Sequence, residues 1–141
     1  MKFDRTERYL IGLPSIPASA FVSLAIAEVE SAWESVKCGT GLVEDVLLTR
    51  SANIHKFGKL LENMNANDEY FDIFKLVPNA KSDDTVLLIW DDWLDVDRAK
   101  FQDVEKEFHN LWFPSADDLD IVEINGAWGV LIDHNGKIKI I

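Results

Sequence analysis

The chain has 141 residues, which is the size of one ordinary domain and enough to bury a core without disulfide or metal crosslinks. Its hydrophobic share of 48% and aromatic share of 11% exclude a disordered polypeptide. The net charge of −11 disfavours nucleic acid and anionic membranes as direct partners, because both would repel the protein. A basic protein partner is compatible with this charge.

The single cysteine, Cys38, excludes an internal disulfide and is typical of a reducing compartment. The first residues, MKFDRTERYL, lack the apolar core that secretory signals carry. The longest uninterrupted apolar run, VLLIW at 86–90, is far shorter than the roughly 20 residues needed to cross a bilayer. We therefore expect a soluble cytoplasmic protein.

The N-terminal third predicts one long helix. Residues 1–9 fit either a short helix or an edge segment, and IGLPSIP at 11–17 predicts a connection whose Pro17 suits the first turn of a helix. From 18 to 37 the apolar residues recur at spacings of 4, 3, 4 and 3, which predicts an amphipathic helix ending at Cys38-Gly39. Its apolar stripe consists of Val22, Ile26, Val29, Trp33 and Val36.

The middle of the chain leaves more alternatives open. LVEDVLLT at 42–49 fits a strand and a helix equally well, and DEYFDIFKLVP at 68–78 predicts a strand or an irregular packed segment. Between them we expect a helix over 54–65 that Ser51 or Asn53 caps. Its apolar face would hold Ile54, Phe57, Leu60, Leu61 and Met64.

A buried central strand is expected at 85–90, TVLLIW, because the run is β-branched and aliphatic and lies between aspartates. A helix from about 97 to 112 should follow, and Pro114 should end it. One face of this helix would carry Phe101, Val104, Phe108 and Leu111 or Trp112.

The last 25 residues contain two Asn-Gly pairs, at 125–126 and 135–136, each between runs rich in Ile and Val. This pattern predicts a three-stranded meander over 119–124, 127–133 and 137–141, with two-residue type I′ turns. Two-residue loops would place Leu131 opposite Ile140, with Ile138 on the same core face. The other face, with Trp128 and Val130, would be partly wet and could serve a homodimer.

Together these elements predict a single α+β domain over 1–141. An antiparallel sheet of four to five strands, the meander plus 85–90, would be covered on one face by two to three helices.

Signatures of catalysis and cofactor binding are not apparent in the sequence. There is no glycine-rich nucleotide loop, and the three histidines, His55, His109 and His134, have no His or Cys at ligand spacing. The acidic stretch 91–97 resembles a calcium loop but lacks its central glycine and distal glutamate. We therefore expect no metal, no cofactor and no catalytic residues, and a role other than that of an enzyme.

The distribution of acidic residues is the most unusual feature of the sequence. From 83 to 123 there are thirteen acidic residues and three basic ones, so this stretch carries nearly the whole net charge. Acidic residues beside tryptophan can combine steering charge with a large anchor for a protein partner. The candidate contact residues are Asp91, Asp92, Trp93, Asp95, Asp97, Asp117 and Asp118.

The same residues also have a simpler interpretation. Asp97 would cap the helix that it precedes, Asp117 or Asp118 would close a turn, and the tryptophans would lie in the core. In that case the acidic stretch serves solubility alone.

Three segments, VLLIWDDW at 86–93, LWFPSADDLDIVE at 111–123 and GAWGVLIDHNGKIKI at 126–140, resemble small bacterial immunity-type proteins of toxin systems. The similarity covers roughly the last 60 residues. The resemblance implies that the chain neutralises a basic toxin, such as a nuclease, by occlusion. Complementary charge would accelerate the encounter of the two proteins.

Two other functions stay open. A small enzyme or ligand-binding domain would assemble its site from dispersed residues such as His134, Asp133 and Asp92. An interaction module of a larger bacterial complex would need no site of its own. A deep polar pocket with converging ionisable groups would favour the first of these.

Overall fold

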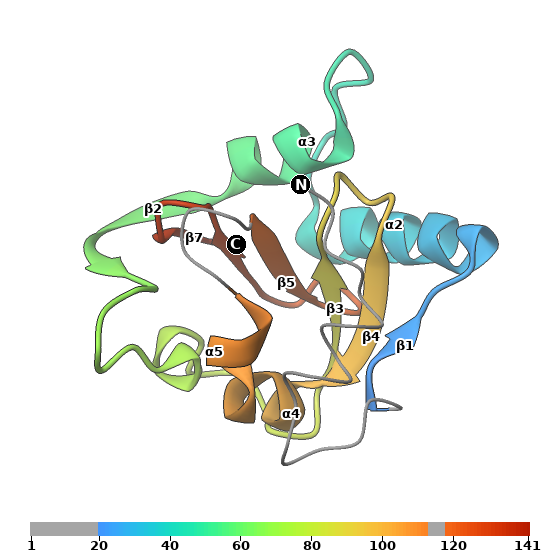
Figure 1. The fold of residues 1–141 in the computed structure, drawn as a ribbon. Coiled ribbons are helices and arrows are strands. Elements are labelled where there is room, and N and C mark those ends of the chain that lie inside the picture. The colour runs from blue at the N-terminus through green and yellow to red at the C-terminus, as the bar shows by residue number, and fades with distance from the viewer. Residues whose placement is uncertain (1–19, 113–117) are drawn as a thin grey trace.

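The computed structural model describes residues 20–112 and 118–141, and a seven-stranded antiparallel sheet organises them (Figure 1). The strand order is β1-β4-β3-β5-β6-β7-β2. The strands are β1 Val22–Ser23, β2 Lys59–Asn65, β3 Thr85–Ile89, β4 Val96–Lys100, β5 Leu119–Glu123, β6 Gly129–Ile132 and β7 Lys137–Ile140. The helices are α2 Ile26–Thr40, α3 Arg50–Phe57, the 3₁₀ helix η2 Ile73–Leu76, α4 Phe101–Lys106 and α5 Phe108–Leu111.

The α+β class is confirmed, and β3 occupies the interior of the sheet as expected. Helices lie on both faces rather than on one: α2 and α3 pack on one face and α4 and α5 on the other, and Figure 1 shows α3 at the top, α2 at the right, and α4 and α5 at the bottom. The four residues from Val86 to Ile89 of β3 are all buried, because Leu87 packs toward α2 while Val86 and Leu88 pack toward α4. An apolar run without alternation is what a strand covered on both faces requires.

Helix α2 begins eight residues later than the stripe predicts. Val22 lies in β1, where it pairs with Arg98 of β4, whereas Val29, Trp33 and Val36 are buried as expected. The helix ends at Gly41, whose φ of 73° gives the left-handed cap, rather than at Gly39. Cys38 and Gly39 therefore lie inside the helix. The expected role of Pro17 lies outside the described residues.

The expected helix over 54–65 is divided into α3 and β2. Helix α3 stops before Gly58, and the chain continues as a strand that pairs with β7. The cap is Thr49, whose hydroxyl accepts the Ala52 N–H at 3.1 Å, rather than Ser51 or Asn53. Residues 68–78 form turns and η2, which confirms the irregular packed alternative.

The expected helix over 97–112 is wrong in its first part, because Val96–Lys100 pairs along its whole length with β3. Only α4 and α5 are helical, and Asp97 is a strand residue rather than a helix cap. The expected apolar face is buried: Phe101, Val104, Phe108, Leu111 and Trp112 all pack into the core beneath the sheet. Pro114 lies outside the described residues.

The C-terminal meander is confirmed, but neither Asn-Gly pair forms the expected type I′ turn, because only the glycine of each pair has a positive φ. The second hairpin is also shifted by one residue. Asp133 pairs with Lys137 across a three-residue loop in which Gly136 has a φ of 82°. Leu131 therefore lies opposite Lys139, and Ile138 joins the face of Ile132. The face expected to be wet is covered by the chain itself, so the surface invoked for a homodimer is buried.

Candidate partner-binding surface

An open groove lies between the first half of α2, residues 44–50 and the turn that joins β3 to β4. Its volume is about 540 Å³. We call it the aliphatic groove, and the residues that define it are Ile26, Glu30, Glu44, Leu48, Asp92 and Leu94.

The β3–β4 turn shapes one wall of this groove. Asp92 and Trp93 have φ of 47° and 67°, and the Leu94 N–H donates to the Asp91 carbonyl at 2.7 Å. These are the features of a type I′ turn, which usually contains Asn and Gly. Each non-glycine residue in the left-handed region costs about 1–2 kcal/mol. Neighbouring contacts must therefore hold the turn in place.

Two such contacts are present. The Asp92 carboxylate accepts the Ser51 N–H at 2.9 Å and so helps to cap α3. The Trp93 ring is 2% exposed and meets the edge of Trp33 at a centroid distance of 5.0 Å. Its indole N–H is buried without a hydrogen-bond partner among the described residues. With both side chains turned inward, Leu94 is the residue that the turn presents to solvent.

The structure separates the candidate contact residues. Asp91 and Asp95 are half-buried on the β3–β4 turn beside Asp92. Trp93 and Asp97 are buried, so the expectation that they offer exposed contacts is wrong; Asp97 accepts the Trp90 indole N–H at 3.3 Å. Burial of Trp93 agrees with the simpler interpretation of the tryptophans as core residues.

The other two candidates follow the chain into β5. Asp118 is exposed. It lies at the same end of the sheet as the β3–β4 turn, because the neighbouring Asp120 pairs with Ile89 at the end of β3. Its carboxylate accepts the backbone N–H of His134 at 2.8 Å. Asp117 lies outside the described residues.

Sequence reasoning missed the exposed aliphatic side chains of the groove and of the connection that forms one of its walls. They are Ile26 (85% exposed), Val43 (93%), Val46 (84%), Leu47 (91%) and Leu94 (75%). Three of them belong to 42–49, the stretch that fitted neither a strand nor a helix better. An apolar segment without a clear periodicity was the only signal available. Aliphatic side chains gathered at such exposure typically mark an interaction surface.

Acidic residues lie beside these aliphatic side chains. Among the described residues, two cations near the groove are paired: Arg50 with Glu30, and Lys37 with Glu34 and Glu44, the latter two at 2.9 Å. These hydrogen bonds raise the pKa of Lys37 and lower the pKa of Glu30 and Glu44. Glu30, Glu34, Glu44, Asp45 and Asp92 outnumber these two cations, so the described surroundings of the groove are negative.

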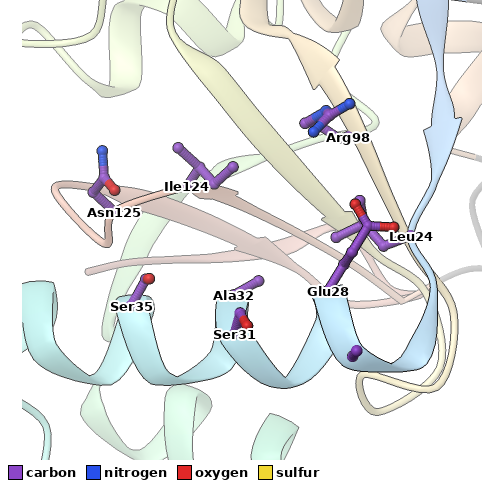
Figure 2. A pocket seen from close by; sticks show the side chains of 9 residues that line it. Leu24, Glu28, Ser31, Ala32, Ser35, Arg98, Ile124 and Asn125 are labelled. Carbon is purple, nitrogen blue, oxygen red and sulfur yellow. The ribbon is translucent and has the colours of Figure 1, made fainter.

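A second hollow, of about 440 Å³, lies between α2 and the turn that joins β5 to β6. Figure 2 shows Ser31 and Ser35 on the helix facing Ile124 and Asn125, with Arg98 above them. Its lining mixes hydroxyl, amide and guanidinium groups on an apolar floor. This hollow could hold a small polar molecule, but none of these groups specifies which one.

A buried ion pair fixes α3 to the sheet. His55 Nε2 lies 2.9 Å from Asp120 Oδ1, and the Asp120 carboxylate is buried. The hydrogen bond with Asp120 raises the pKa of His55, whereas burial raises the pKa of Asp120. Lys139 adds a hydrogen bond to the His55 carbonyl at 3.1 Å. This arrangement is a structural tie between three elements.

The dispersed enzyme site is not assembled in the part of the chain that the structure describes. Asp92 caps α3, Asp133 accepts backbone N–H groups of its own turn, and His134 lies 3.0 Å from Asp118. Over residues 20–112 and 118–141 no three His, Cys, Asp or Glu side chains are placed to hold a metal ion.

Comparison with known proteins adds no assignment: no family model, no curated protein and no solved structure matches this chain. Among the described helices, none has the length and apolar character needed to cross a membrane.

Proposed function

We propose that this chain is an acidic protein-binding domain that docks a basic protein partner at the aliphatic groove. The observation that carries the proposal is a set of five aliphatic side chains, each at least three-quarters exposed: Ile26 and Leu94 line the groove, and Val43, Val46 and Leu47 lie in the connection that forms one of its walls. Fully burying a Val, Leu or Ile side chain gains about 1.5–3 kcal/mol, so a partner that covers several of them would bind tightly.

The charge around the groove supports a basic partner. Glu44 and Asp92 line the groove, Asp45 follows Glu44 in the same connection, and the nearby Lys37 and Arg50 are engaged in ion pairs. Long-range attraction would increase the association rate of a basic protein. With the resemblance of the C-terminal segments, this favours an inhibitor or immunity-type protein that occludes a toxin such as a nuclease. The proposed role is binding rather than catalysis, and it requires no metal or cofactor.

The test uses the protein encoded by the gene adjacent to that of this chain. We expect a one-to-one complex in which Leu94→Ser lowers the affinity about tenfold or more, because the exposed tip of the turn loses its apolar contact. Tyr70→Ser is the matched control, since Tyr70 is 87% exposed and lies outside the groove. Calorimetry measures both affinities.

Association kinetics test the charge separately. The association rate should fall steeply as ionic strength rises, because exposed charges are screened. An association rate that does not change with ionic strength would contradict docking at this groove. So would an equal loss of affinity in Leu94→Ser and Tyr70→Ser. Absence of any complex would count against the immunity-type function.

A further inference from the structure

The connection between α2 and α3 projects from the body of the molecule. Figure 1 shows it rising above α3. We call residues 42–48 the finger. It begins at the buried Leu42, and its aliphatic side chains Val43, Val46 and Leu47 are 93%, 84% and 91% exposed. Folding stability alone would favour polar side chains at such positions.

The backbone of the finger is nevertheless held by hydrogen bonds. The buried Asn53 of α3 accepts the Asp45 N–H through its Oδ1 at 2.7 Å. Its amide nitrogen donates to the carbonyls of Asp45 at 3.0 Å and Thr49 at 2.9 Å. One side chain therefore holds both the middle of the finger, at Asp45, and its C-terminal end, at Leu48 and Thr49.

Contacts within the finger complete its shape. The Asp45 carboxylate accepts the Leu47 N–H at 3.0 Å, and the Leu48 N–H donates to the Asp45 carbonyl at 3.0 Å. At the base, Lys37 of α2 donates to Glu44 at 2.9 Å. The finger is thus attached to both of the helices that it connects.

A loop with an ordered backbone and aliphatic side chains in water is suited to binding. Ordering the loop before the encounter removes most of the entropy cost that a flexible loop would bear on binding. A projecting apolar tip fits a hollow on the partner, whereas a flat partner would leave most of it uncovered. The acids Glu44 and Asp45 at the base match a basic rim around that hollow.

We propose that the finger inserts into a concave apolar pocket on the basic protein partner, with Val46 and Leu47 as the inserted side chains. The proposal rests on the proposed function and specifies how that partner is occluded: the finger plugs a cleft, and the groove covers its edge. The shape of the finger is set by Asn53 before the partner arrives.

The first experiment needs no partner. Amide hydrogen exchange of the free protein should show protection at Asp45 and Leu48, whose N–H groups donate in the finger. Asn53→Ala should remove the protection at Asp45, while the double variant Val46→Ser/Leu47→Ser should retain it. Unprotected finger amides in the wild-type protein would overturn the proposal of a preformed plug.

The second experiment measures affinity for the protein encoded by the adjacent gene. Val46→Ser/Leu47→Ser should lower the affinity about a hundredfold, mainly through faster dissociation, because two inserted side chains are lost. Asn53→Ala should lower it about tenfold with the contact side chains intact, because the loop is then ordered only on binding. The Tyr70→Ser control should bind as the wild-type protein does.

The outcomes separate the two proposals. A complex that Leu94→Ser weakens but the finger variants do not would leave the groove as the docking site and overturn insertion of the finger. Failure of every variant and of the wild-type protein to bind would count against the proposed function itself. Sedimentation of the protein alone tests whether a second copy of the chain binds the finger. A dimer that the finger variants dissociate would overturn the proposal that the finger binds a basic protein partner.

Discussion

Two hairpin turns of the same sheet both require a positive φ, but one places glycine at that position and the other places non-glycine residues there. The β6–β7 hairpin places Gly136, which adopts a positive φ at little cost, at the position that requires it. The β3–β4 hairpin places Asp92 and Trp93 in the left-handed region, where each is strained. The first turn serves the sheet alone, whereas the second also caps α3 and fills the core against Trp33. Strain retained in this way typically marks a functional segment.

Substitutions of Trp93 should have the largest effect on the free energy of unfolding and should reveal the strain in the β3–β4 turn. Trp93→Ala should destabilise the protein by about 3–5 kcal/mol, because a large buried ring is lost. Trp93→Gly should cost about 1 kcal/mol less than Trp93→Ala, since glycine relieves the positive φ. Urea unfolding measures both values.

Trp128 in the meander supplies the control for the relative stability losses of the glycine and alanine variants. Trp128 is buried, but its φ is not positive, so Trp128→Gly should cost more than Trp128→Ala. The same order at both positions would show that the β3–β4 turn is not strained.

Alanine substitutions at two glycines outside the β6–β7 turn distinguish the stability cost of a left-handed conformation from the cost of steric crowding. Gly41 has a φ of 73° with open space around it, and Gly126 has a φ of 77° with the Val36 carbonyl oxygen 2.7 Å from where a Cβ would lie. Gly41→Ala should therefore cost about 1–2 kcal/mol, from conformation alone. Gly126→Ala should cost about 1–3 kcal/mol more, because α2 must move away from the β5–β6 turn. Equal losses in thermal unfolding would show that α2 is free to shift.

A pH-dependent effect is expected from the pair that links the α3 region to the meander. The pKa of His55 is raised by its hydrogen bond with Asp120, helped by the charge of Asp118 and opposed by Lys139. Its contribution to stability is therefore complete below the pKa of an unfolded histidine, about 6.5, and is lost as pH rises through the raised value. Burial raises the pKa of Asp120, which also lowers stability as pH rises.

We expect the free energy of unfolding to fall by about 1.5–3 kcal/mol as pH rises through the raised pKa of His55, the usual contribution of a charged hydrogen bond. His55→Gln should remove most of this dependence. His134→Gln should preserve it, because its exposed pair with Asp118 contributes little. If the free energy of unfolding of His55→Gln depended on pH as it does in the wild-type protein, the stabilising role of the His55–Asp120 pair would be contradicted.

Much of the fold could be predicted because strong local patterns agree with their final environment. The apolar run of β3, the buried stripe of Val29, Trp33 and Val36, and the Ile/Val runs of the meander all retained the structure that they predict. The errors fall where a residue pattern suits two structures. Residues 59–65 and 96–100 became strands because β7 and β3 supply hydrogen-bond partners that no local sequence window contains.

The candidate site was only partly predictable for the same reason. Acidic residues near 91–95 are visible in the sequence, and the structure places them beside the groove. Whether an apolar residue is covered depends on its neighbours in space, so Trp93 was assigned to the surface wrongly and Leu94, Val46 and Leu47 were missed.

By itself the amino-acid sequence determined the α+β class, the central strand and the meander, because repeated hydrophobic spacing specifies which residues a fold must bury. Tertiary structure decided that both sheet faces are covered, that the strained turn lies at Asp92 and Trp93, and that a clamp at Asn53 holds an aliphatic finger in water. The first two depend on contacts between residues distant in the chain, and the third on the way in which α3 folds back on the connection before it, none of which local preference encodes.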